Sequence, residues 1–253
     1  MPPNPDRRTL RLDLWRLGHL LVVASAVIFA LGVGRELIIG QIGTETPLQD
    51  LRHFALDSER SLPAWYSSLL MVGCAVLLFC TARLTRQDGG RDVLRWSLLA
   101  LIFLVMSIDE AVSFHEVLIE PLRNGLGTSG IFYFAWVIPG SVIVGLLGLY
   151  FLPFLFRLTT RSAVLFAAAG AIYVGGALGL ELIGGSLADA YGIESTPYLV
   201  AAVLEEGLEI AGLTVFFLSL TDHLARHWPV VGIAVASRPR SEAVRWQASQ
   251  PAE

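Results

Sequence analysis

Six long apolar runs, separated by shorter polar segments, dominate the pattern of this chain. Each run is close to the roughly 20 residues that an α-helix needs to cross a bilayer. No stretch alternates apolar and polar residues with a period of two, as the strands of a membrane barrel would. The pattern therefore predicts an all-α, polytopic membrane bundle of six transmembrane helices, over residues 14–33, 65–82, 94–116, 131–156, 162–184 and 198–220.

Composition agrees with a protein whose main partner is the lipid bilayer. Hydrophobic residues make up 54% of the 253 residues and charged residues only 16%, against roughly 25% charged in soluble domains. The predicted helices form a single domain over residues 1–228. The remaining residues, 229–253, are polar and include Pro239 and Pro251, which predicts a disordered cytoplasmic tail.

The arginines orient the predicted helices. All 18 basic residues are arginine, and 14 of them fall at the N-terminus, at the C-terminus or in the two loops on that same side. The opposite loops hold the other four, which are Arg35, Arg52, Arg60 and Arg123. Because cytoplasmic loops are enriched in basic residues, this split predicts that both termini are cytoplasmic. We expect a multi-pass protein of a bacterial inner (plasma) membrane.

Eight ionisable side chains interrupt or end three of the apolar runs. A charged side chain in hydrocarbon costs a few kcal/mol even on mild insertion scales, so such residues are functional by default. In the predicted orientation, all eight fall in the outer half of the membrane. The orientation comes from the arginines and the depth from the apolar runs, so two separate features agree. They are therefore expected to share one site: Asp109, Glu110, His115, Glu116, Glu181, Glu205, Glu206 and Glu209.

Helical spacing predicts how these side chains face. Asp109 and Glu116 are seven residues apart, so in one continuous helix they share a face to within about 20°. Glu205 and Glu209 are four apart and stack along their helix. Clustered carboxylates repel one another unless some are protonated or a cation lies between them.

A metal site is the first hypothesis for this cluster, with all eight residues as candidate ligands. Helical bundles hold pairs of iron or manganese ions between inward-facing Glu and His side chains. An oxygen-rich set with His115 as its one nitrogen ligand favours iron or manganese, while calcium or zinc is also compatible. The Glu-x-x-His signature of di-iron bundles is absent. The substrate of such a membrane metalloprotein would be a lipid or another apolar molecule.

Three other interpretations remain open. The cluster could form a proton or cation pathway, or the chain could be an accessory subunit of a membrane complex. The acids could also be structural, with Glu110 and Glu206 paired to arginines near the outer interface and His115 and Glu116 capping their helix. The chain has no nucleotide-binding motif and no basic groove for nucleic acid.

The loop over residues 35–63 allows two interpretations. It could be a lid that offers His53, Asp57 or Glu59 to the site. It could also be a helix entry with solvated charges, since Pro63 can open the following helix and Trp65 fits an aromatic belt at the membrane interface.

Four segments carry a resemblance to a known family. They read DSERSLPAWYSS at 57–68, SIDEAVSFHE at 107–116, GALGLEL at 176–182 and LEEGLEIAG at 204–212. Together, over about residues 50–224, they resemble a family of uncharacterised bacterial multi-spanning membrane proteins with intramembrane acidic motifs. The resemblance implies that these positions matter and implies no particular reaction.

Overall fold

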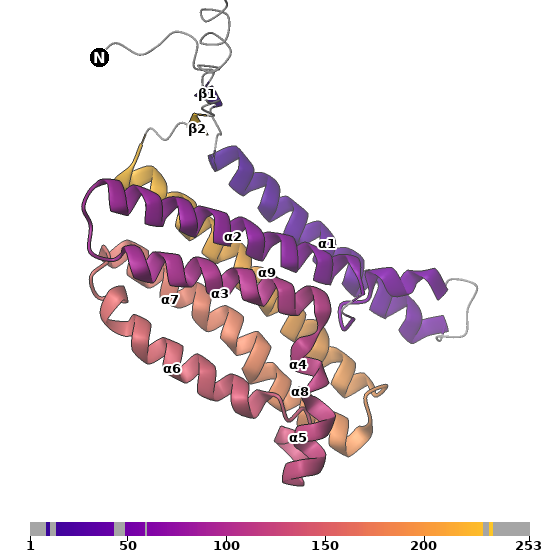
Figure 1. Ribbon diagram of the computed structural model, residues 1–253. Helices are drawn as coiled ribbons and strands as arrows, with labels where there is room; N and C mark the ends of the chain where they lie inside the picture. Colours follow the sequence, from indigo (N-terminus) through magenta and orange to yellow (C-terminus); the bar gives the residue numbers. More distant parts are fainter. Residues whose placement is uncertain (1–8, 11–13, 43–48, 59, 230–232, 235–253) are drawn as a thin grey trace, which may run out of the picture.

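Long helices lying side by side form the body of the computed structural model, which describes residues 9–10, 14–42, 49–58, 60–229 and 233–234 (Figure 1). The chain order is β1 (Thr9–Leu10), α1 (Leu14–Ile42), η1 (Gln49–Phe54), α2 (Leu62–Gln87), α3 (Val93–Val112), α4 (Phe114–Val117), α5 (Ile119–Leu126), η2 (Gly130–Phe132), α6 (Val137–Leu155), α7 (Thr160–Val174), the π-helix η3 (Gly175–Leu180), α8 (Glu181–Tyr191), α9 (Thr196–His227) and β2 (Ile233–Ala234). The two short strands pair antiparallel. Most of the predicted tail, 229–253, lies outside the described residues.

Several helices are long and apolar enough to cross a membrane, as the sequence predicted. Among the described residues four such spans stand alone: Trp15–Gly40, Leu62–Gln87, Val137–Leu155 and Thr160–Tyr191. A fifth results if α3 and the bent segment after it count as one span. Helix α9 has 32 residues, but its acidic residues interrupt the apolar run. The all-α membrane bundle is therefore supported, while the count of six spans stays a prediction.

Helix α9 packs against α1, α2, α7 and α8. Buried aromatic residues fill the core beside it. The ring of Trp96 on α3 meets Phe154 edge-on at 4.8 Å, and Phe103 stacks on Phe216 of α9 at 4.7 Å. Because α9 is packed on several sides, its three glutamates project from a fixed backbone.

The predicted helix over 94–116 is wrong at its C-terminal end. Helix α3 stops at Val112, and Ser113 takes a left-handed conformation with φ of 59°. The next segment, Phe114–Leu126, bends away by 65°. The Asp109 side chain accepts a hydrogen bond from the His115 backbone N–H at 3.1 Å. In a continuous helix this N–H would donate to a backbone carbonyl instead. Glu116 therefore lies on α4, and the expected shared face with Asp109 does not exist.

Two further predicted helices differ from the observed ones. The run predicted as one helix over 131–156 contains η2 and then α6, which begins only at Val137. The run over 162–184 belongs to a longer span, Thr160–Tyr191, with a π-helical stretch inside it. There η3 and α9 approach closely: a Cβ atom added to Gly176 would lie 2.8 Å from the Glu205 carbonyl oxygen. Such π-helical stretches frequently occur at functional sites.

Candidate functional site

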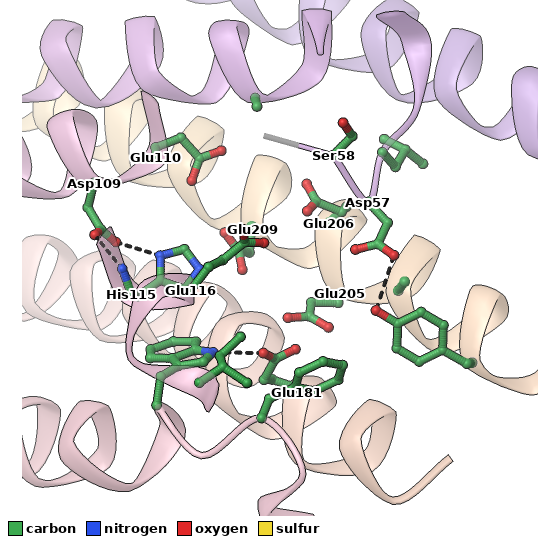
Figure 2. Close-up of a pocket in the computed structure, with 17 residues that line it drawn as sticks. Asp57, Ser58, Asp109, Glu110, His115, Glu116, Glu181, Glu205, Glu206 and Glu209 are labelled. Carbon is green, nitrogen blue, oxygen red and sulfur yellow. Dashed lines mark hydrogen bonds and ion pairs between the residues drawn. The ribbon is translucent and has the colours of Figure 1, made fainter. Parts of the chain in front are cut away.

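A pocket of about 130 Å³ lies at the end of the bundle where α3 gives way to α4 (Figure 2). We call it the acidic pocket, because eight carboxyl side chains and one imidazole line it. All eight residues expected from the sequence are among them. Their side chains come from α3, α4, α8 and α9, with one more from the loop before α2. The ionisable lining residues are Asp57, Asp109, Glu110, His115, Glu116, Glu181, Glu205, Glu206 and Glu209.

His115 is held in place by Asp109. Its Nδ1 atom lies 2.8 Å from one carboxylate oxygen of Asp109, while its backbone N–H donates to the other oxygen. In Figure 2 the other ring nitrogen lies on the side of the pocket toward Glu116 and Glu209. This arrangement matches metal-binding histidines, in which the ring nitrogen remote from the metal usually bonds a carboxylate.

Glu181 connects the aromatic wall of the pocket to the acids of α9. The Trp136 indole N–H donates to a Glu181 oxygen at 2.7 Å, and the Trp136 ring lies 4.7 Å from the His115 ring. In Figure 2 the Glu181 and Glu205 carboxyl groups lie toward each other in the pocket. Two neighbouring carboxyl groups repel one another when both are ionised, so this pair favours a proton or another cation between them.

The chain before α6 folds so that Trp136 reaches Glu181. Gly130 has a φ of 60°, a conformation that residues with a Cβ rarely adopt. Its backbone N–H donates to Asp189 of α8 at 2.9 Å. This hydrogen bond holds the loop at Gly130 against α8, eight residues beyond Glu181. The sequence did not reveal the role of Trp136, since an aromatic residue near a helix start also fits a membrane-interface belt.

The loop before α2 contributes to the pocket in part as the lid interpretation expected. Asp57 and Ser58 line it, while His53 is not among its lining residues and Glu59 lies outside the described residues. The Tyr198 hydroxyl of α9 donates to Asp57 at 3.1 Å. Asp57 is thereby a ninth ionisable group beside the eight expected ones.

No arginine or lysine lines the acidic pocket among the residues that the structure describes. Two of the arginines on this side have other contacts: Arg35 pairs with the neighbouring Glu36 at 2.7 Å, and Arg123 lies 3.9 Å from the centre of the Tyr133 ring. The charge of the pocket must therefore be balanced largely by protons or by bound cations.

The acids line one pocket without forming a metal-ligand geometry. Within the described part of the chain, no three His, Cys, Asp or Glu side chains lie close enough to hold one metal ion. A cation could draw them together only by moving these carboxylates inward.

A comparison with protein families identifies the chain. The model of a family described as a domain of unknown function (DUF8692) matches residues 17–224. The chain belongs to this family. The match includes all the ionisable residues of the acidic pocket. Searches of curated proteins and of solved structures find no match.

Proposed function

We propose that the protein is an integral membrane metalloprotein whose acidic pocket binds divalent metal, most readily two ions. One observation carries the proposal. Carboxylates from separate helices, with one histidine, line a single pocket that has no arginine or lysine among its described lining residues. A divalent cation compensates such a set most directly, and the preponderance of oxygen ligands favours iron or manganese.

The side chains divide into two roles under this proposal. His115 supplies a nitrogen ligand through the atom remote from Asp109, and Asp109 orients the ring. Glu181 and Glu205 bind the metal in place of a proton, and the remaining acids complete the set: Glu110, Glu116, Glu206 and Glu209. Trp136 holds Glu181 by its hydrogen bond.

The proposed setting is a bacterial plasma membrane, with both termini cytoplasmic and the pocket in the outer half of the bundle. The arginine distribution supports this orientation. An activity on a lipid or other apolar substrate would suit a pocket at this depth, but the proposal concerns metal binding.

A proton-handling site is the second candidate. The placement of the Glu181 and Glu205 carboxyl groups toward each other favours it, since neighbouring carboxyl groups are stabilised when a proton lies between them. A pathway should continue through the bundle. Among the side-chain hydrogen bonds of the described residues, Ser68 bonds Ser107 at 2.9 Å and Ser25 bonds Tyr66 and Thr214 at 2.7 Å each, and no hydrogen bond links these two groups. This separation favours a closed site over conduction. A third role, as an accessory subunit of a membrane complex, is compatible with either chemistry.

Elemental analysis of detergent-purified protein tests the proposal. We expect about one to two metal ions per chain, and a loss of most of this metal in Glu205→Gln, which preserves side-chain size. The matched control is Glu120→Gln, because Glu120 is exposed on α5 and does not line the pocket. Protein that stays metal-free after incubation with iron, manganese, zinc and calcium would overturn the proposal and leave the protonated pair as the better explanation.

A further inference from the structure

The segment after the break at Ser113 presents large apolar side chains outward. Val117 is 68% exposed, Leu126 60% and Phe114 59%. In the described bundle α5 packs mainly against α4 and makes few contacts with other elements. These side chains therefore have little protein against them, although Glu116 and Ile119 of the same segment line the acidic pocket.

The ends of this segment place it at the membrane boundary. Helix α3 has 20 residues and so is about 30 Å long, which matches the hydrocarbon thickness of a bilayer. Residues 113–136 follow it directly and lead into α6, which begins at Val137 and is itself long and apolar enough to span. Both ends of the segment are therefore fixed at the same membrane face.

The bend decides how the segment lies there. An axis turned by 65° from α3 runs closer to the membrane plane than to the direction of a spanning helix. The apolar residues Leu118, Leu122 and Leu126 follow one another on one side of α5 and its N-cap at four-residue spacing, and Leu118 and Leu126 are exposed, whereas Glu120 and Asn124 lie on the other side. Helices with this division lie in the interface, with their apolar side among the acyl chains.

We propose that the segment Phe114–Leu126 is an interfacial helix pair whose apolar side chains contact lipid acyl chains at the pocket end of the bundle. The bilayer is the occupant that the geometry favours, because the exposed apolar side chains follow directly on α3, whose 20 residues match the hydrocarbon thickness and which is long and apolar enough to span when it is counted with this segment. One wall of the acidic pocket is then built by a membrane-embedded element. This places the mouth of the pocket at the level of the lipid headgroups, whether or not the pocket binds metal.

Fluorescence quenching in lipid vesicles tests this placement. A polarity-sensitive dye is attached at Leu118→Cys or Leu126→Cys in the full chain, both exposed in the native protein, with the native cysteines removed as Cys74→Ala and Cys80→Ala. The matched control is Asn124→Cys, which labels the polar side of α5. A second control, Leu104→Cys on the exposed side of α3, verifies that the bundle sits in the bilayer. Quenching by nitroxide-labelled phosphatidylcholine is compared with quenching by a water-soluble quencher.

We expect the ratio of lipid quenching to aqueous quenching to be several-fold higher at positions 118 and 126 than at 124. Equal ratios at all three positions, with normal lipid quenching at 104, would overturn the proposal. Protection of 118 and 126 from both quenchers would also overturn it and would indicate a protein partner. Metal content does not enter the measurement, so its outcome is separate from that of the metal proposal.

Discussion

The carboxylate of Asp109 holds His115 through both the backbone and the ring of that residue. One oxygen accepts the backbone N–H at 3.1 Å, and the other lies 2.8 Å from Nδ1. The first contact helps end α3, and the second orients the imidazole toward the pocket. A single acid thus determines both where the helix breaks and which ring nitrogen faces the other carboxylates.

Replacing Asp109 should weaken metal binding without abolishing it. In Asp109→Ala the His115 ring loses its partner, and loss of such a partner typically costs 10–100-fold in metal affinity. We expect an affinity loss of about this size with unchanged stoichiometry, measured by competition with a chelating dye. Glu120→Ala should bind as the wild type does. An unchanged affinity would show that Asp109 does not position His115, whereas complete loss of metal would make Asp109 a ligand.

Adding a methyl group where the π-helix η3 and α9 approach should destabilise the bundle. In Gly176→Ala the new Cβ would lie 2.8 Å from the Glu205 carbonyl oxygen and 3.2 Å from the Glu209 side chain. Overpacking of this kind costs about 1–3 kcal/mol. We expect a lower unfolding temperature in detergent and weaker metal binding.

The control for this substitution is Gly179→Ala, in the same π-helical stretch. Outside its own stretch of helix, no heavy atom lies within 4 Å of a Cβ atom placed there. Its unfolding temperature should stay close to the wild-type value. If both variants unfold at the same temperature, the close approach at Gly176 does not contribute to stability.

The apolar runs and the arginine positions were enough to predict that the eight ionisable residues lie together at one end of the bundle. They could not predict the break at Ser113. The break depends on the Asp109 side chain, which accepts the His115 backbone N–H in place of a backbone carbonyl. They could not predict the bond between Trp136 and Glu181 either, since these residues are 45 positions apart and meet only through the turn at Gly130. The metal-binding role of the eight residues stays a prediction.

Acid should loosen the contact between the start of α3 and the end of α6. The hydrogen bond from Arg157 to Asp92, at 3.1 Å from Nε, holds the pKa of the Asp92 carboxyl below its ordinary value of 3.8. A lowered pKa in the folded state means stability that is present above pH 4 and lost as the pH falls below it. We expect the unfolding temperature of the wild type to fall more steeply below about pH 4 than that of Asp92→Asn.

The comparison variant for this titration is Glu194→Gln, in the exposed turn between α8 and α9. It should retain the steep wild-type dependence, because its carboxyl group makes no contact with Arg157. Equal slopes for the wild type and Asp92→Asn would show that this ion pair contributes no measurable stability.

The orientation of the bundle can be tested with two labelling positions. The 14-to-4 distribution of arginines predicts that the loop between α2 and α3 is cytoplasmic and that α5 is on the outer side. With the native cysteines replaced, a membrane-impermeant thiol reagent added to intact cells should label Asn124→Cys and leave Gln87→Cys unlabelled until the cells are opened. Both positions are exposed, so a difference in labelling reports sidedness rather than burial. Labelling of Gln87→Cys alone would invert the orientation and place the acidic pocket on the cytoplasmic side. Labelling of both positions in intact cells would contradict the predicted topology, because the loop between α2 and α3 would then be accessible from outside despite its arginines.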